Sequence, residues 1–332
     1  MRKLIAFVLV LAGLWSGYWF VGSTAKHQVI TAWLDARRAD GWTAEFSDFQ
    51  VVGFPNRFDS RFTDLHLLDP RSGIEWMAPE FDILALSYQP NHIIAVWPPA
   101  QNLGFPLETV SITNSRMVAS VVFEPDTKLA IDRTSLEIRN LELQGGSGWQ
   151  TSIGSLILST RQHPNVAFAH DVVFDAKSLH PTVNLLQTLD PAGTLPMTIE
   201  ALFLDVQLDF DAPWDRIAVE EGAPLVIKIT VNRMTAAWGK LGLDGKGVLN
   251  VSADGRISGT LDVALKNWPA VIDLFASSGA ISAYMAATIK SGLGLFASGS
   301  EEDPLAATLT LEDGFMKLGP ITIGPAPRFI RS

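Results

Sequence analysis

The chain begins with a long uncharged run and then changes to an alternating pattern. Arg2 and Lys3 precede an apolar segment that begins at Leu4 and ends at Val21. Its eighteen residues would rise about 27 Å as a helix, close to the ~30 Å hydrocarbon core of a bilayer. Aromatic side chains gather at its far end, where a membrane interface would hold an aromatic belt: Trp15, Tyr18, Trp19 and Phe20. The pattern predicts a transmembrane anchor over residues 1–24, inserted in the lipid bilayer.

A cleaved signal peptide is the alternative to an anchor. Ser23, Thr24 and Ala25 offer small residues for cleavage near Ala25. The apolar run is longer than the roughly 7–15 residues of a usual signal-peptide core, which favours the anchor. In both cases the basic N-terminus stays in the cytoplasm and the rest of the chain is exported. We therefore expect a single-pass inner-membrane protein with the bulk of the chain in the periplasm, or a periplasmic protein released by cleavage.

A helix is predicted just beyond the anchor, over residues 25–41. Gly41 is placed to end it. Mostly apolar side chains share one face at helical spacing: Val29, Ile30, Trp33, Leu34 and Arg37. We expect this face to pack on the sheet in preference to binding a partner.

Beyond Trp42 the period of the pattern approaches two residues, which is typical of strands. Turn signals such as Gly53-Phe54-Pro55 and Asp254-Gly255 separate the apolar segments. Helices are predicted at residues 179–189 and 268–296, the second with a break near Gly279. The predicted strands lie at residues 44–52, 56–68, 80–88, 91–97, 107–113, 117–123, 129–143, 152–160, 166–174, 202–210, 225–234, 241–251, 257–265, 305–311 and 315–318.

This succession of strands has no strand–helix–strand rhythm, so a Rossmann or barrel enzyme is not expected. The predicted fold class is mainly β with some α. It consists of an N-terminal transmembrane helix, an extended antiparallel sheet that curls into a half-barrel or forms a sandwich, and a late helical pair. A proline-containing segment divides the strand pattern. We expect a first β-rich module over residues 42–175 and a second over residues 196–332, with its helices near 268–296.

Composition narrows the functional classes. The chain has 332 residues, of which 47% are apolar and 18% charged, so a large packed core is expected and disorder is not. The formal net charge of −10 argues against a nucleic-acid partner, because phosphates require clustered Lys and Arg. With no cysteine, disulfide scaffolds and thiolate metal sites are excluded.

The clearest functional signal is the apolar face of the predicted sheet. Along residues 202–210, apolar side chains alternate with a mostly polar set that includes Asp205 and Asp209. Few helices are predicted to cover that face, so it is either packed against a second sheet or borders an apolar groove. The residues expected to line such a groove for lipid or another apolar ligand are Leu202, Leu204, Val206, Leu208, Ile257, Leu261 and Val263.

Motifs for catalysis are missing from the sequence. It has no Gly-x-Ser-x-Gly, no zinc-protease helix motif and no phosphate-binding glycine loop. The Ser-x-x-Lys match from Ser23 to Lys26 is attributed to chance. Asp205 and Asp209 would suit a glycosidase only across a cleft, and a solvated sheet face explains them better. We expect no enzyme activity, no cofactor and no metal site, although three histidines share one stretch: His163, His170 and His180.

Short motifs along nearly the whole chain resemble, in their order, those of an uncharacterised family of Gram-negative bacteria catalogued as domain of unknown function 2125. The resemblance implies a membrane-anchored exported protein and supplies no reaction, ligand or binding residue. The motifs that carry it are Trp33 with Arg37, Gly41-Trp42, Gly53-Phe54-Pro55-Asn56-Arg57-Phe58, Asn267-Trp268-Pro269, Asp313-Gly314 and Leu318-Gly319-Pro320.

The layout of one anchor and a long amphipathic sheet is similar, more distantly, to the AsmA-like envelope proteins, which are associated with outer-membrane lipid homeostasis. This chain is much shorter than the large members of that group, which argues against a complete lipid conduit. Two functions stay open from the sequence. The protein holds lipid or another apolar ligand in envelope maintenance, or it is a structural scaffold of the envelope with a protein partner and no ligand groove.

Overall fold

The protein is mostly antiparallel sheet. Strands hold 53% of the residues and helices 22%, which confirms the predicted class of mainly β with some α. A curled sheet is consistent with this topology. The structure is a computed structural model that describes residues 1–191, 193–279, 281–294, 304–319 and 321–329.

Two compact units make up the chain. Unit 1 comprises Met1–Pro125 and Thr134–Trp149, and unit 2 comprises Asp126–Arg133 and Gln150–Ser332. The segment predicted to separate two modules, between residues 175 and 196, lies inside unit 2. The predicted modules over residues 42–175 and 196–332 stay a prediction.

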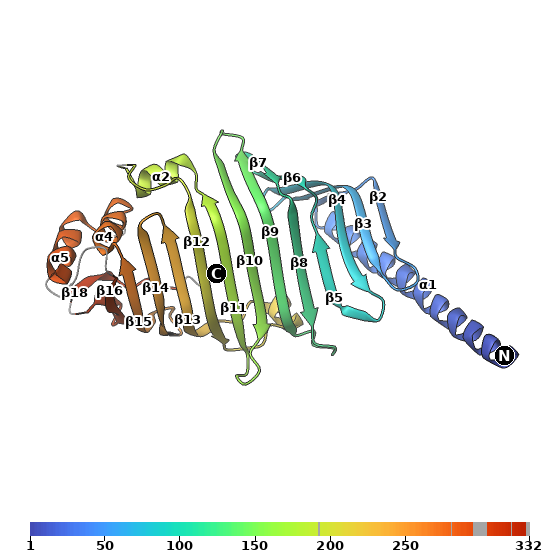
Figure 1. The fold of residues 1–332 in the computed structure, drawn as a ribbon. Helices are drawn as coiled ribbons and strands as arrows, with labels where there is room; N and C mark the ends of the chain where they lie inside the picture. Colours follow the sequence, from blue (N-terminus) through green and yellow to red (C-terminus); the bar gives the residue numbers. More distant parts are fainter. Residues whose placement is uncertain (192, 280, 295–303, 320, 330–332) are drawn as a thin grey trace. The chain divides into compact units, whose positions relative to one another are not determined.

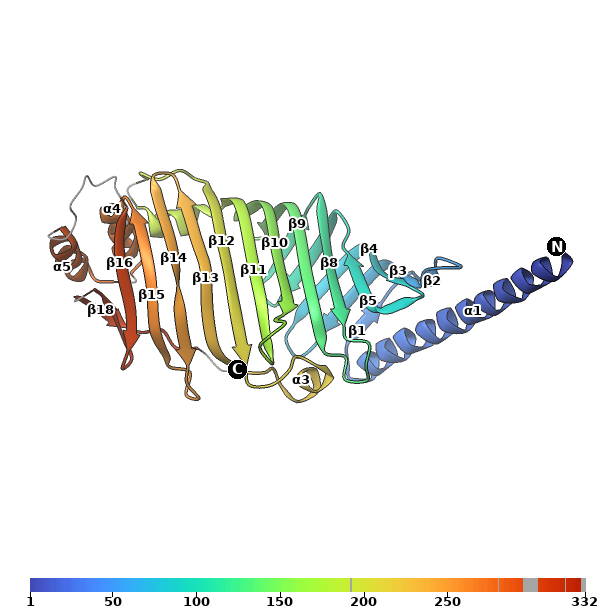
Figure 2. The ribbon, with the colours of Figure 1, turned by 60° about the horizontal axis from the view of Figure 1, so that its bottom comes forward.

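Unit 1 begins with one continuous helix, α1 (Arg2–Ala39), whose N-terminal end extends beyond the strands (Figures 1 and 2). The predicted anchor and the predicted helix that follows it are therefore parts of a single element, since no proline interrupts the segment. The helix is long and apolar enough to cross a membrane. Gly41, with a φ of 89°, follows its C-terminal end, the position at which glycine most often ends a helix.

The strands of unit 1 pair around the long strand β3. The first half of β3 pairs with β2 and its second half with β1, while β4 runs along its other edge. Strand β4 pairs with β6 near its start and with β5 near its end, and further pairs join β5 to β8, β6 to β7 and β7 to β9. The strands are β1 (Thr43–Glu45), β2 (Asp48–Val52), β3 (Asp59–Asp69), β4 (Ile74–Leu86), β5 (Gln89–Val96), β6 (Ala100–Phe105), β7 (Glu108–Thr113), β8 (Arg116–Phe123) and β9 (Ile131–Gly145).

Unit 2 is an antiparallel meander in which each strand pairs with the next, seen side by side in Figure 2. Its helices are α2 (Val183–Leu189), α3 (Arg216–Glu221), α4 (Trp268–Ser277) and α5 (Ala283–Gly294). Its strands are β10 (Gln150–Gln162), β11 (Ala169–His180), β12 (Ile199–Phe210), β13 (Val226–Trp238), β14 (Leu241–Val251), β15 (Ile257–Lys266), β16 (Leu305–Glu312), β17 (Phe315–Leu318) and β18 (Ile321–Pro325).

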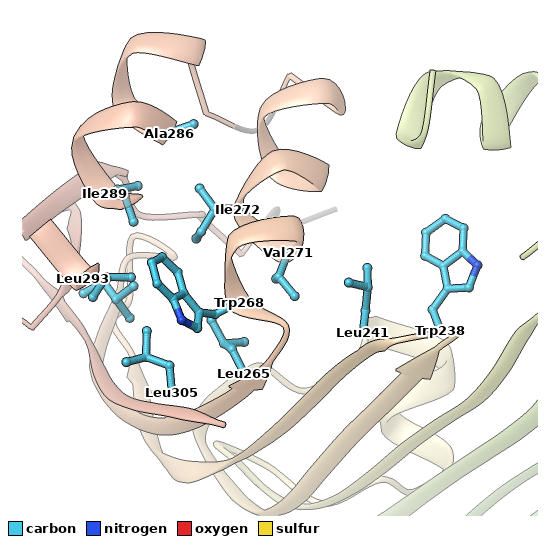
Figure 3. Packing of buried hydrophobic residues seen from close by; sticks show 11 residues of the cluster. Trp238, Leu241, Leu265, Trp268, Val271, Ile272, Ala286, Ile289, Leu293 and Leu305 are labelled. Carbon is cyan, nitrogen blue, oxygen red and sulfur yellow. The ribbon is translucent and has the colours of Figure 1, made fainter. Parts of the chain in front are cut away.

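The largest hydrophobic core lies where α4 and α5 cover the end of this meander (Figure 3). Trp268 and Leu293 from the helices meet Leu265 of β15 and Leu305 of β16, and all four side chains are buried. The pair of helices confirms the predicted late helical segment. Its last two residues, 295 and 296, lie outside the described part of the chain.

Four short elements depart from the sequence prediction. Strand β6 occupies residues between the strands predicted at 91–97 and 107–113, and β18 lies in a Gly- and Pro-rich tail in which no strand was predicted. Helix α3 has only six residues, too few for a periodic pattern, and begins at the cap Asp215, whose carboxylate accepts from the backbone N–H groups of Ile217 and Ala218. The helix predicted from residue 179 begins only at Val183, because β11 continues to His180.

Candidate functional site

An apolar cavity of about 360 Å³ lies in unit 1 between α1 and the β3–β4 hairpin. No polar residue lines it, so it offers a ligand contact surface without hydrogen bonds. Val29 and Trp33 are 69% and 50% exposed, so the cavity is open beside the helix. The lining comprises Val29, Ile30, Trp33 and Leu34 of α1, Phe62, Leu65 and Leu67 of β3, and Trp76, Phe81 and Ile83 of β4.

The helical side of the cavity belongs to the mostly apolar helix face that the sequence predicted. Leu34 is 2% exposed and packs in one core cluster with Phe62 and Leu65. Ile30 packs against the same cluster. This contact confirms the expected packing of the helix on the sheet. The same face leaves Val29 and Trp33 at the rim, because they project to the side of the buried Leu34.

The strand side of the cavity depends on a change of phase at Asp64. Phe62 and Leu65 are three residues apart, and a regular strand would place them on opposite faces. Asp64 has a φ of 50°, a left-handed conformation that Asp tolerates better than most residues, and its carboxylate accepts a 2.9 Å hydrogen bond from the Ser47 hydroxyl. The alternation therefore restarts beyond Asp64, and Leu65 and Leu67 join Phe62 on the cavity wall.

Aromatic rings stack along this wall. The Phe49 and Phe62 ring centroids are 4.5 Å apart and nearly parallel, and Trp76 meets Phe81 edge to face at 5.0 Å. The Trp76 indole donates a 2.7 Å hydrogen bond to the buried side chain of Gln101, so its polar atom is satisfied away from the cavity. The wall therefore keeps its apolar surfaces towards the space between helix and sheet.

One edge of the unit 1 strands is hydrogen-bonded to α1 near the C-terminal end of the apolar run of the helix. Trp15 donates to the Pro55 carbonyl at 3.0 Å, Trp19 to the Arg57 carbonyl at 2.7 Å, and Tyr18 to the Ser87 carbonyl at 2.6 Å. The acceptors belong to two turns, residues 53–58 before β3 and residues 87–88 between β4 and β5. The motif Gly53–Phe58 thus has a structural role, which is to receive the aromatic donors of the helix.

The next turn of α1 packs on the ring of Phe58. Gly22 lies directly against this buried ring. The ammonium of Lys26 donates to the Phe58 carbonyl. Burial lowers the pKa of Lys26, while the nearby carboxylate of Asp59 acts in the opposite direction. Asp59 is 4% exposed and is held by Arg57 through a 2.7 Å salt bridge.

The seven residues predicted to line a groove lie in unit 2 on β12 and β15. Strand pairing places Val206 opposite Val172 of β11 and opposite Val231 of β13. Leu261 lies opposite Gly247 of β14, which in turn faces Val231. The predicted residues of the two strands therefore belong to one apolar face that continues across the meander.

Burial along this predicted lining is uneven. Val206 is 4% exposed and Ile257 8%, and Ile257 belongs to a core cluster against which Leu261 packs. Val263 packs against the core under α4 and α5. The remaining three residues are half-buried: Leu202, Leu204 and Leu208. Ligand binding by this set stays a prediction.

The ionisable residues considered from the sequence take local roles. Asp205 accepts from the Asn232 side chain at 3.0 Å, and Asp209 accepts from Gln207 at 2.7 Å. Ser23 donates to its own helix at Phe20 and does not contact Lys26 in a catalytic pair. Within the described residues, no group of three or more His, Asp or Glu side chains is placed to hold a metal ion.

These features define a class: a protein with one N-terminal helix able to cross a membrane, carrying a mostly antiparallel β structure with an apolar cavity beside that helix. The chain matches, over residues 19–327, a family described as an uncharacterized protein conserved in bacteria (DUF2125), and it belongs to this family. No curated protein and no solved structure matches the chain. The architectural similarity to AsmA-like proteins is not shown by these comparisons and remains an expectation.

The cavity of unit 1 was not predicted from the sequence. Its helical half was visible in the spacing of Val29, Ile30, Trp33 and Leu34. Its strand half was hidden, because the change of phase at Asp64 breaks the alternation that identifies a buried face. In the sequence, two polar residues, Thr63 and Asp64, separate the apolar Phe62 from the apolar Leu65. An apolar spacing of three inside a strand is the signal that would have indicated the change of phase.

Proposed function

We propose that this protein binds an acyl chain of a membrane lipid in the cavity between α1 and the β3–β4 hairpin. The observation that carries the proposal is the composition of the lining: ten apolar side chains line a cavity of about 360 Å³. This volume lies within the range of about 300–1,000 Å³ that is usual for small-molecule sites. A wholly apolar lining disfavours polar ligands, whose groups would lose their hydrogen bonds to water.

The position of the cavity supports a lipid over another apolar ligand. Its helical lining begins eight residues beyond Val21 and ends at Leu34, so it lies about 12–20 Å along the helix from the end of the apolar run. An acyl chain that leaves the bilayer beside α1 would meet the rim formed by Val29 and Trp33. The proposal gives the protein a binding role in envelope maintenance and no catalytic one.

The proposed location is the inner membrane, with α1 as an uncleaved anchor and the bulk of the chain in the periplasm. The basic Arg2 and Lys3 before the apolar run support this orientation. Contacts of α1 support retention of the helix. Cleavage near Ala25 would remove Trp19, which is 8% exposed and hydrogen-bonded to the Arg57 carbonyl, and would uncover the Phe58 ring.

The test is native mass spectrometry with lipid extraction on the full chain and on two matched variants. Val29→Glu places a charge at the cavity rim, whereas Gln28→Glu adds the same charge at a neighbouring exposed position that does not line the cavity. We expect stoichiometric lipid on the wild type and on Gln28→Glu, and at least a tenfold loss on Val29→Glu. Both variants retain the same membrane helix, so lipid merely adhering to that helix affects them equally.

Two results would reject this proposal. A lipid-free mass for the wild type would favour the alternative function, a structural scaffold of the envelope with a protein partner and no ligand groove. Lipid that persists on Val29→Glu and is lost on a Leu204→Glu protein with wild-type circular dichroism would transfer the site to the apolar face of unit 2. In that case the lining predicted on β12 and β15 would hold the ligand.

A further inference from the structure

The edge of unit 1 that receives α1 lies beside the last residues of the apolar run of the helix. Three side chains of the helix, Trp15, Tyr18 and Trp19, donate hydrogen bonds to carbonyl oxygens of that edge at 2.6–3.0 Å. The apolar run ends only at Val21. Trp15 is therefore about 9 Å inside the end of the run along the helix axis, and the carbonyl it contacts is at the same depth.

The required length of a membrane span excludes an arrangement with this edge in water. If the membrane ended before Trp15, the span would comprise only Leu4 to Leu14 and would rise about 16 Å. The hydrocarbon core is ~30 Å thick, and a mismatch of that size is not accommodated by tilting, because tilt shortens a span further. The run from Leu4 to Val21 fits with its aromatic end at the interface.

The side chains of this edge suit the interfacial layer of a bilayer. The two turns, residues 53–58 and 87–88, present Phe54 at 53% and Tyr88 at 59% exposure. Phe54 stacks with Phe20 of the helix at a centroid distance of 5.8 Å. Tyr is one of the two aromatic residues enriched at membrane interfaces, and the apolar ring of Phe54 is stabilised by leaving water. The ionic group of the first turn, Arg57, is paired with Asp59.

Backbone carbonyl groups of the edge already accept hydrogen bonds within the protein, as a site with little water requires. A carbonyl group in a bilayer must have a donor within the protein. The Gly53 carbonyl accepts from Arg57, and the Asn56 carbonyl accepts from Ser87. The carbonyls of Pro55, Arg57 and Ser87 accept from the three aromatic donors of α1, and that of Phe58 accepts from Lys26.

From these observations we propose that the turns at residues 53–58 and 87–88 insert into the interfacial layer of the bilayer that α1 crosses, at the leaflet nearest Val21. The inference rests on the anchoring role of α1 in the proposed function and is independent of lipid in the cavity. Unit 1 then contacts the membrane with its own strand edge as well as through its helix. Phe54 and Tyr88 are the side chains that reach the lipid.

The experiment uses the natural absence of cysteine. Single-cysteine variants of the full chain, labelled with the environment-sensitive NBD fluorophore, are reconstituted in phosphatidylcholine vesicles with or without bromine atoms on the lipid chains near the headgroups. Phe54→Cys and Tyr88→Cys report on the edge, and Leu9→Cys reports on the inserted helix. Arg71→Cys is the control in water, because it lies in the turn at the other end of β3, roughly 40 Å from Phe58 along the strand.

We expect bromine to reduce the emission of the labels at positions 54, 88 and 9 and to leave the label at position 71 unchanged. Labels at 54 and 88 as insensitive as the one at 71, with the label at 9 quenched, would overturn the inference while the anchor stands. A label at 9 that is not quenched would remove the anchor and the inference with it. Tyr88→Cys decides alone if the Phe54→Cys protein fails to fold, because Tyr88 is exposed in a turn.

Discussion

A Cβ atom on Gly22 would lie 2.5 Å from Cζ of Phe58, so the helix and this buried ring pack with no room for a methyl group. The contact joins the end of the apolar run of α1 to the residue immediately before β3. Glycine is used here for close approach of a backbone to a side chain, since its backbone has ordinary helical geometry.

The first prediction concerns this contact. Gly22→Ala forces the Phe58 ring to shift and should destabilise unit 1 by about 1–3 kcal/mol relative to the control, as overpacking in cores usually does. Gly17→Ala is the matched control, because no atom lies within 4 Å of its added methyl group and both changes gain the same helix propensity. Limited proteolysis at the junction of α1 and β3 in detergent measures the difference. Equal protease resistance of the two variants would contradict tight packing.

A second prediction concerns the buried face of β12. Val206→Asp places a charge at a position that is 4% exposed and surrounded by the apolar residues Val172 and Val231. Neither of these paired neighbours carries a charge to match the carboxylate, so we expect unit 2 to lose its cooperative fold. Val248→Asp makes the same change at a 39% exposed position of β14, opposite Thr230 and Thr260, and should leave circular dichroism and melting nearly unchanged. A folded Val206→Asp protein would show that water reaches this face.

The third prediction tests the core under the late helices. Ile289 of α5 is 1% exposed, and Ile289→Ala should cost about 2–5 kcal/mol because the packed helices cannot fully close the space that it leaves. Tyr284→Ala, on the same helix at 83% exposure, should stay within about 0.5 kcal/mol of the wild type. Hydrogen exchange of the amides in β15 and β16 reports the change. Similar exchange in the two variants would argue that α5 is not part of the core.

The fourth prediction is a pH dependence in unit 2. Burial lowers the pKa of His170 from its ordinary 6.5, although the carboxylates of Asp171 and Asp132 act in the opposite direction. As the pH falls below 6.5, the unfolded chain takes up the imidazole proton before the folded chain does. The free energy of unfolding must therefore decrease as the pH falls from 6.5 towards the lower pKa of the folded state.

Hydrogen exchange of β11 amides between pH 7 and pH 5, corrected for intrinsic rates, measures this dependence. His170→Gln removes the titrating group and should flatten the slope, whatever it does to stability at pH 7. Carboxylates elsewhere contribute equally to both proteins and cancel in the difference. Parallel slopes for wild type and variant would contradict the assigned burial.

Sequence periodicity was sufficient for the class of fold and for most strands. Strands β14 and β17 have the bounds predicted for them, because each lies between clear turn residues, such as Asp254-Gly255 after β14. The long apolar helix was predictable because a membrane-crossing segment requires a fixed apolar length. A local sequence pattern carries no information about which strands pair with each other. The pairing of one half of β3 with β2 and of the other half with β1 was therefore not predictable.

The cavity illustrates why the site was only half predictable. The helix face from Val29 to Leu34 follows a fixed geometry of 3.6 residues per turn, and its composition was enough to identify it. The strand wall depends on the φ of one residue, Asp64, and on the position of β4 beside it. The aromatic contacts of Gly53–Phe58 join residues about forty positions apart, which no local pattern contains.

The unbroken course of α1 has a mechanical consequence. Its 38 residues form a rod of about 57 Å with no flexible linker between the apolar run and the strands of unit 1. If α1 crosses a membrane as proposed, a thinner bilayer would increase the tilt of the helix. This tilt would be transmitted to the strands of unit 1, because the side chains of α1 are hydrogen-bonded to the carbonyls at their edge. Membrane thickness would thereby set the orientation of unit 1 relative to the bilayer. The cavity rim at Val29 and Trp33 would rotate together with unit 1.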